Sequence, residues 1–272
     1  MNWKNLFTPV RDMTPAEAKA YIEGHGSTEY QLLDVRQPKE YEAGHLAGAK
    51  LIPIRELPDR LAELNKEQPL LVYCAVGGRS KAAAQLLAGQ EFREVYNLSG
   101  GIKAWEGGQA TGPEAAGLEL FTGDLEYGDA AALAYAMEDG LQGFYRQLEA
   151  QAAGPEQQRL YEQLAHFEEK HKARLVEEYR THHGGAAFTA QDLGIMEGGQ
   201  RVAEFFDRAK AHLRTPHDIL ELAMALETQA LDLYSRMAQK SVAADTRGFF
   251  LSMADEEKQH LGYLAKELDR LL

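Results

Sequence analysis

Hydrophobic and polar positions follow different patterns in the two halves of the chain. In the first half, short apolar runs at residues 32–35 and 70–73 end in polar or Gly-rich turns, as buried parallel strands do. Helical stretches are predicted around these runs, at residues 14–24, 56–65 and 79–89. This alternation of strands and helices predicts a small α/β domain.

From about residue 126 the apolar positions recur with the period of an α-helix, and β-branched residues become few. The pattern predicts four long helices, over residues 126–152, 155–182, 216–240 and 243–271. A long connection over residues 183–215, with a short helix near 200–213, separates the two pairs. The second half is therefore predicted to be a four-helix bundle with one long crossover connection.

The two patterns meet in a stretch after Trp105 that is rich in Gly and Ala and has no periodicity. A chain of 272 residues is long enough for two hydrophobic cores. We therefore predict a multidomain protein with a small α/β domain over residues 1–108, a linker over 109–118 and an all-α four-helix bundle over 119–272.

Composition and charge narrow the classes of function. Apolar residues make up 44% of the chain, but no run reaches the roughly 18 residues of a membrane span, and no secretory signal is evident. We therefore expect a cytoplasmic protein with no membrane partner. The whole chain has a net charge of −13. Residues 111–272, with 16 basic and 28 acidic side chains, contribute most of it. Such an acidic surface argues against nucleic acid as a partner.

The single cysteine, Cys74, directly follows the predicted strand 70–73 and precedes a Gly-rich loop and a predicted helix. At the carboxyl end of a parallel strand it faces a helix N-terminus, which stabilises a thiolate and lowers the thiol pKa. The loop glycines allow backbone N–H groups to form an anion cradle, and Arg79 adds a cation. A lone cysteine is otherwise most often a small buried apolar residue. The strand end, the Gly-rich loop and Arg79 favour a reactive Cys74 instead.

The first 110 residues resemble the rhodaneses in four segments that occur in the right order. The segments are Leu33-Asp34-Val35-Arg36 with Glu40-Tyr41, Gly44-His45-Leu46 with Gly48-Ala49, the cysteine loop, and Leu98-Ser99-Gly100-Gly101-Ile102 leading to Trp105. The resemblance implies that Cys74 accepts a sulfane sulfur from a small donor such as thiosulfate, holds it as a persulfide and passes it to cyanide or a thiol. It also implies that Arg79 binds anions and that the substrate-binding loop contains Ala75, Val76, Gly77, Gly78 and Ser80.

Related phosphatases and arsenate reductases of the same fold have a loop that is one residue longer. Arg79 is the sixth residue counted from Cys74, and this loop length favours sulfur transfer over phosphate chemistry. We assign Asp34 and Arg36 mainly to structure, as an ion pair near the loop.

The two predicted helix pairs repeat each other at an offset of 89 residues without a gap. Each repeat has a lone Glu on its first helix and a Glu-x-x-His on its second helix, and this i, i+3 spacing puts both side chains on one helical face. The six residues are Glu138, Glu168 and His171 in the first repeat and Glu227, Glu257 and His260 in the second. The lone glutamates lie among apolar neighbours, where an uncompensated carboxylate is costly. Carboxylates with imidazoles suit two iron ions, or manganese as the alternative.

Residues 126–271 resemble the rubrerythrin branch of the ferritin-like superfamily, which implies a di-iron centre bound by these six residues. The chain lacks the four-cysteine iron site of rubrerythrins, and Ala230 stands where they have a further carboxylate. A more symmetric six-ligand centre is therefore expected, and rubrerythrin-type peroxide reduction is put in question. Tyr145 and Tyr234, each seven residues after a lone Glu, lie on the same face as these glutamates, either as hydrogen-bond partners of the ligands or as core residues.

Three functions fit these features. The first is sulfur transfer at Cys74 coupled to a di-iron bundle with oxidase or peroxidase chemistry. The second is an iron-storing or iron-sensing protein with an accessory sulfur-binding rhodanese module. The third is sulfur transfer alone, with a metal-free bundle that serves for dimerisation. In each case we expect a homodimer formed through the bundle.

Overall fold

The structure is a computed structural model that describes residues 9–119, 121–182, 187–189 and 192–271. The chain forms two compact units, Met1–Ala115 and Ala116–Leu272. Part of the segment predicted as a linker is bonded to the first unit. Ala110 pairs with His45 in an antiparallel bridge, and the N–H of Gly112 donates to the carbonyl of Glu42.

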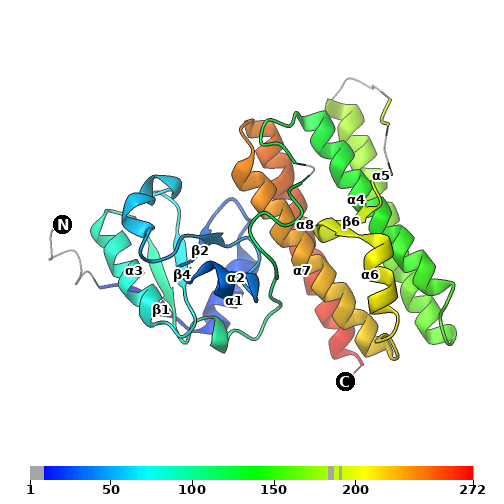
Figure 1. The fold of residues 1–272 in the computed structure, drawn as a ribbon, viewed down its shortest axis with the longest axis horizontal. Coiled ribbons are helices and arrows are strands. Elements are labelled where there is room, and N and C mark those ends of the chain that lie inside the picture. Colours follow the sequence, from blue (N-terminus) through cyan, green and yellow to red (C-terminus); the bar gives the residue numbers. More distant parts are fainter. Residues whose placement is uncertain (1–8, 120, 183–186, 190–191, 272) are drawn as a thin grey trace. The chain divides into compact units, whose positions relative to one another are not determined.

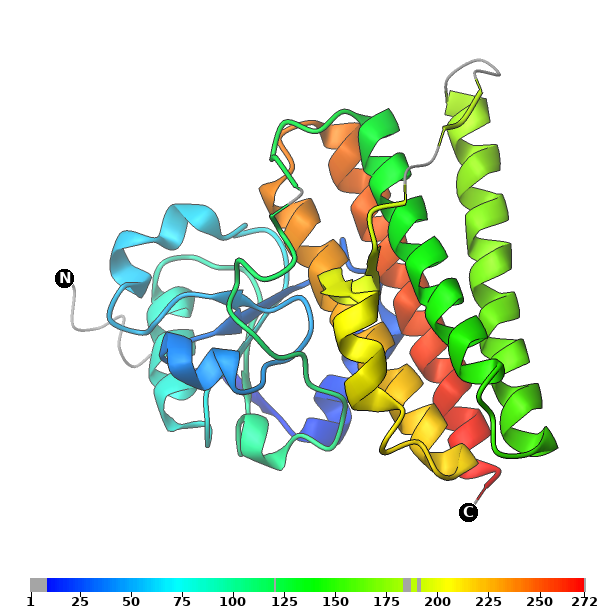
Figure 2. The same ribbon diagram turned by 45° about the vertical axis from the view of Figure 1, so that its right-hand side comes forward.

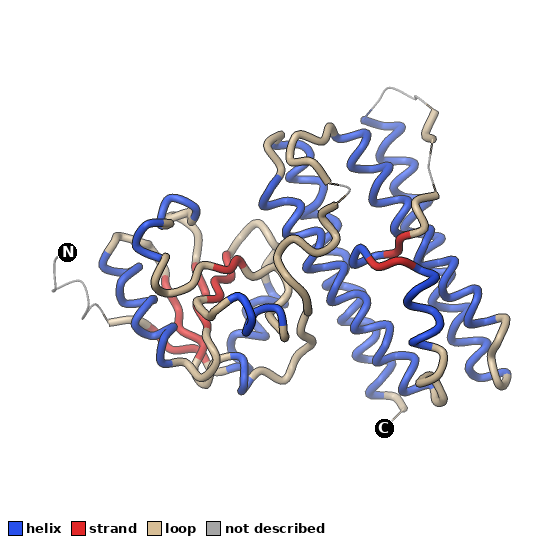
Figure 3. Tube along the Cα trace, in the orientation of Figure 1, coloured by secondary structure: helices blue, strands red, loops and turns tan. Residues whose placement is uncertain are grey.

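The first unit is built on a five-stranded parallel sheet with the order β1-β5-β4-β2-β3, drawn in red in Figure 3. The strands are β1 (Arg11–Met13), β2 (Gln31–Asp34), β3 (Lys50–Leu51), β4 (Leu70–Tyr73) and β5 (Val95–Leu98). The two apolar runs of the sequence are β2 and β4, which pair at the centre of the sheet. Alternate side chains of these strands enter two separate apolar clusters, as a sheet buried on both faces requires.

Helices of the first unit are α1 (Pro15–Gly24), α2 (Pro38–Glu42) and α3 (Gly78–Gly89), with a 3-10 turn η4 (Ile102–Ala104) after β5. The N-terminus of α1 is fixed by a capping box. The side chain of Thr14 accepts from the N–H of Glu17, and the N–H of Thr14 donates to the Glu17 carboxylate. The predicted helices 14–24 and 79–89 are thus confirmed.

The helix predicted over residues 56–65 is not an α-helix. Two 3-10 turns take its place, η2 (Leu57–Asp59) and η3 (Leu61–Glu63), separated by Arg60 with φ −115° and ψ 14°. Leucines that recur three or four residues apart fit successive 3-10 turns as well as one α-helix, so the apolar period could not distinguish them.

The second unit contains the four predicted long helices, α4 (Tyr127–Glu149), α5 (Pro155–His182), α7 (Pro216–Lys240) and α8 (Ala244–Asp269). α4 packs along α5, and α7 along α8 (Figures 1 and 2). The expected fold class, a small α/β domain followed by a helical bundle, is therefore confirmed. Both lone glutamates and both Glu-x-x-His motifs lie in the middle of these helices.

The crossover between the helix pairs has a structure that was only partly predicted. Its short helix is α6 (Val202–Ala209), inside the predicted 200–213. Before it, β6 (Ile195–Met196), the turn η5 (Glu197–Gly199) and β7 (Gln200–Arg201) form a small antiparallel hairpin. β6 packs against α4, and η5 packs against both α4 and α7, where the yellow segment lies in Figure 2.

Candidate functional site

Cys74 lies immediately after β4 and is fully buried. The backbone N–H of Gly77 donates to its Sγ over 3.2 Å, and the Ser80 hydroxyl lies 3.5 Å from the same atom. Burial by itself would raise the pKa of the Cys74 thiol. The Ser80 hydroxyl and the loop N–H groups outweigh burial and lower this pKa below its ordinary value. The loop therefore stabilises a thiolate, which was the chemical reason for predicting a reactive cysteine.

The loop takes its shape from glycines at two places. Gly77 has φ +95° and precedes the first turn of α3, so Ala75 and Val76 form the outer part of the loop and Gly78 begins the helix. Gly101 has φ +60°, and a Cβ built on it would lie 2.3 Å from the carbonyl oxygen of Cys74. The N–H of the next residue, Ile102, donates to that carbonyl over 2.8 Å. The Gly-Gly segment after β5 thus packs against the backbone of the cysteine loop.

Arg79 is paired with Glu40 of α2. Its two terminal nitrogens donate to the two carboxylate oxygens over 2.8 and 2.6 Å. This bidentate pair lowers the pKa of Glu40 to about 2 and raises that of Arg79. Part of the Arg79 charge is therefore already compensated by Glu40, while the N–H of Gly77 donates to Sγ of Cys74. The predicted structural pair also forms, with Arg36 donating to both oxygens of the Asp34 carboxylate.

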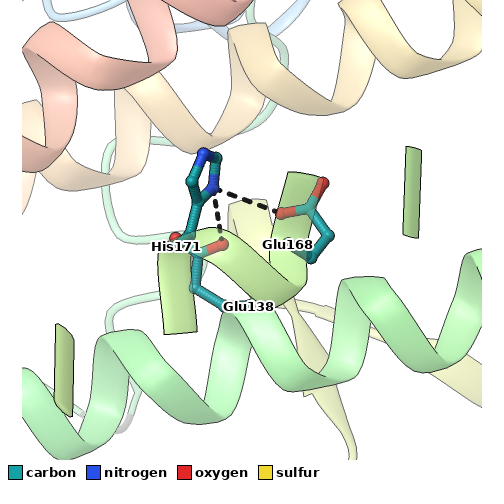
Figure 4. A group of neighbouring side chains, drawn as sticks. All are labelled: Glu138, Glu168 and His171. Atoms are coloured by element: carbon teal, nitrogen blue, oxygen red, sulfur yellow. Dashed lines mark hydrogen bonds and ion pairs between the residues drawn. The ribbon is translucent and has the colours of Figure 1, made fainter. Parts of the chain in front are cut away.

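In the second unit the first predicted trio comes together between α4 and α5 (Figure 4). Nδ1 of His171 lies 3.2 Å from a carboxylate oxygen of Glu138 and 3.5 Å from one of Glu168. Both glutamates are buried. One possible ligand atom from each of the three residues lies within 4.8 Å of the other two.

The second trio forms in the same way between α7 and α8. Nδ1 of His260 lies 3.0 Å from a carboxylate oxygen of Glu257 and 3.5 Å from one of Glu227. Again one atom from each residue lies within 4.8 Å of the others, and both glutamates are buried. The sequence repeat is thus also a repeat of two carboxylate and histidine clusters.

A further buried carboxylate, which the sequence analysis did not identify, lies with these clusters. Glu197 of η5 is 1% exposed, and one of its oxygens lies within 4.8 Å of oxygens from Glu138 and Glu257. The hydroxyl of Tyr234 donates to Glu197 Oε1 over 3.1 Å. Glu197 precedes Gly198-Gly199 in a stretch without helical period and outside the 89-residue repeat, so no periodic signal indicated it.

Without a cation, the negative charge of these buried carboxylates has to be compensated in another way. Burial raises the pKa of Glu168, Glu197 and Glu257 well above the ordinary value, and neighbouring carboxylates raise each further. Burial would also lower the pKa of His171, but Glu138 and Glu168 raise it to about 10. Protons must therefore compensate charge here when no metal ion does.

Comparison with known proteins assigns both units. A family model described as Rubrerythrin matches residues 129–268, and one described as Rhodanese-like domain matches residues 14–107. The chain belongs to the rubrerythrin family and carries a rhodanese-like domain. The first match covers all six predicted metal ligands and Glu197, and the second covers Cys74 and its loop.

The curated relatives match the rhodanese-like domain. The uncharacterized protein YqhL of Bacillus subtilis is 44% identical over 98 residues, which are 36% of this chain and 74% of the relative. Thiosulfate sulfurtransferase GlpE of Ectopseudomonas mendocina is 38% identical over 74 residues, 27% of this chain and 68% of the relative. A rhodanese-like domain protein from Staphylococcus aureus, solved by crystallography, is 30% identical with a TM-score of 0.35, and the match covers 38% of this chain and 98% of that one.

The rubrerythrin unit meets the chemical requirements of a di-metal site. Among the described residues, several buried carboxylate oxygens have no hydrogen-bond partner, and cations would compensate them. Within the two trios and Glu197, these atoms are Glu138 Oε1, Glu168 Oε2, Glu197 Oε2, Glu227 Oε2 and Glu257 Oε1. Carboxylates combined with imidazoles suit iron or manganese.

Within the described part of the chain, no helix is both long and apolar enough to span a membrane.

Proposed function

We propose that the rhodanese-like domain is a sulfurtransferase that carries a sulfane sulfur on Cys74. The observation that carries this proposal is the hydrogen bonding of Sγ at the carboxyl end of β4, where Gly77 and the other loop N–H groups lower the thiol pKa. The similarity to GlpE, whose name states thiosulfate sulfurtransferase, supports thiosulfate as the first donor to test.

In the proposed reaction the Cys74 thiolate attacks the outer sulfur of thiosulfate. A new S–S bond forms to Cys74, the S–S bond of thiosulfate breaks with its electron pair on the leaving group, and sulfite departs. Cyanide, or a thiolate, then attacks the outer sulfur of the persulfide and releases the Cys74 thiolate. Backbone N–H groups of the loop stabilise the negative charge on sulfur at each stage.

Thiosulfate and cyanide turnover, measured as thiocyanate, tests this proposal. The wild-type protein should form thiocyanate, and mass spectrometry should find one added sulfur atom on Cys74 after treatment with thiosulfate alone. Cys74→Ser should abolish both signals while the metal content of the bundle stays unchanged. Full activity in Cys74→Ser would reject the assignment.

For the rubrerythrin unit, we propose two iron ions held by the two trios, Glu138, Glu168 and His171 and Glu227, Glu257 and His260. The carboxylates and imidazoles bind the ions, and the surrounding apolar core limits access of water. When bound, such a centre supplies redox chemistry with oxygen or peroxide. Metal analysis after purification without added metal tests occupancy. Consumption of oxygen or peroxide by the iron-loaded protein separates an oxidoreductase from a storing or sensing role, in which iron binds without turnover.

A further inference from the structure

Glu197 is held so that one carboxylate oxygen is bound by the protein and the other is not. Oε1 accepts a hydrogen bond from the Tyr234 hydroxyl over 3.1 Å. Oε2 is buried and has no hydrogen-bond partner anywhere in the described ranges. A buried carboxylate oxygen without a donor is costly unless a proton or a cation compensates it. The orientation therefore leaves a free oxygen for a cation.

The position of Glu197 indicates that this cation would be one bound by the two trios. One of its oxygens lies within 4.8 Å of oxygens of both Glu138 and Glu257. Glu138 belongs to the trio between α4 and α5, and Glu257 belongs to the trio between α7 and α8. Glu197 is therefore next to both half-sites, although it lies on neither helix pair.

The backbone of the crossover hairpin approaches α4 and α7 closely at two points. A Cβ on Gly140 of α4 would lie 1.9 Å from the carbonyl oxygen of Ile195, and one on Gly198 would lie 2.8 Å from Cβ of Gln229 on α7. Gly140 is in a helix interior, where glycine costs about 1 kcal/mol relative to alanine. Gln229 follows Gly140 by the 89 residues of the repeat, so the hairpin contacts the same register on both repeats.

We propose that Glu197 is a fifth carboxylate ligand of the metal centre, supplied by the crossover hairpin to both half-sites. This inference rests on the proposed binding of metal by the two trios. From α7, Glu227 is the carboxylate in the cluster, and the residue three positions later is the buried Ala230. The six-ligand symmetric centre expected from the sequence thus gains a ligand that has no counterpart in the repeat.

A fifth carboxylate changes the charge of the centre. Four carboxylates balance two divalent ions, whereas five leave one excess negative charge. The excess charge favours the more oxidised metal ions, so Glu197 should lower the reduction potential of the centre. A carboxamide of the same shape, Glu197→Gln, removes this charge with little change in volume.

The test compares full-length wild-type protein with Glu197→Gln and with Glu204→Gln, a control at an exposed glutamate on α6 of the same crossover. Ferrous ion is titrated anaerobically, bound iron is counted, and the loaded centre is titrated spectroscopically with redox mediators. Glu197→Gln should weaken iron binding by at least about tenfold and raise the reduction potential. Glu204→Gln should match wild type in both.

The melting temperature with and without iron provides a readout besides activity. Iron should raise the melting temperature of Glu197→Gln less than that of wild type, because the variant supplies one carboxylate fewer to the ions, whereas Glu204→Gln should gain as much as wild type. Unchanged iron affinity and potential in Glu197→Gln would overturn the role of Glu197 and leave the two trios as the site. If wild type itself binds no metal, the proposed metal centre fails instead.

Discussion

The imidazole rings of His171 and His260 are stacked, with centroids 4.0 Å apart and planes 5° apart. These residues are 89 positions apart and therefore equivalent in the repeat, one on α5 and one on α8. Two imidazolium cations at this distance would repel each other, whereas metal-bound imidazoles are neutral. The stack joins the two trios into one centre, and loss of a carboxylate on either side should affect both.

Replacing one carboxylate in each trio should eliminate metal binding. We expect Glu168→Ala combined with Glu257→Ala to bind no iron, because each ion then loses a ligand and part of its charge compensation. Bound metal is measured by elemental analysis, and thiocyanate formation should persist at the wild-type rate. Glu169→Ala, at an exposed neighbour on α5, is the control and should bind normally. Two ions retained in the double variant would contradict the site.

Removing the metal should destabilise the rubrerythrin unit, because the free energy of metal binding to the folded site is then lost. At a metal concentration about 100-fold above the dissociation constant, binding contributes about 2.7 kcal/mol, which corresponds to roughly 5–10 °C in melting temperature. Calorimetry with and without a chelator measures this change. A thermal transition of the bundle that does not respond to chelation would argue against bound metal.

The reactivity of Cys74 should extend to lower pH than that of an ordinary thiol. The thiolate is the reactive form, so alkylation speeds up as pH rises through the thiol pKa, and a lowered pKa moves this rise to lower pH. Ser80→Ala removes a donor to the thiolate and should move the midpoint of alkylation to higher pH. The rate of iodoacetamide alkylation against pH measures it, with Ser99→Ala as an exposed control. Equal midpoints for all three proteins would exclude the Ser80 contribution.

Gly140 should tolerate no side chain, unlike Gly143 on the same helix. A methyl group on Gly140 collides with the Ile195 carbonyl, so Gly140→Ala should destabilise the bundle by roughly 1–3 kcal/mol despite the higher helix propensity of alanine. At Gly143 nothing lies within 4 Å of the added carbon, and Gly143→Ala should stabilise by up to about 1 kcal/mol. Urea unfolding compares the two. Equal effects would show that the hairpin does not need the close approach.

The boundary between the units is also testable. Ala110 pairs with His45 and the N–H of Gly112 donates to Glu42, so a fragment of residues 1–115 should be more stable than one of residues 1–108. We expect the longer fragment to unfold at a higher urea concentration and to retain thiocyanate formation. If the shorter fragment is equally stable, these contacts contribute nothing to the fold.

The sequence by itself determined the parts of this protein that depend on local spacing. Strand 70–73 followed by Cys74 and glycines specifies a strand, a turn and a helix, and the N–H groups that lower the thiol pKa lie within six residues of the sulfur. Glu-x-x-His specifies one helical face, since residues three apart are neighbours on any α-helix. The 89-residue repeat places the same three residues in each half of the bundle, and this spacing was enough to predict all six.

Only the tertiary structure decided contacts between residues far apart in the chain. Glu40 is 39 residues from Arg79, and their pairing depends on where α2 and α3 meet around the loop. Glu197 lies in a segment without period, and it reaches the clusters because Gly140 and Gly198 allow backbone to approach helix directly. Such approaches depend on the packing of distant segments, which no local pattern of polar and apolar residues records.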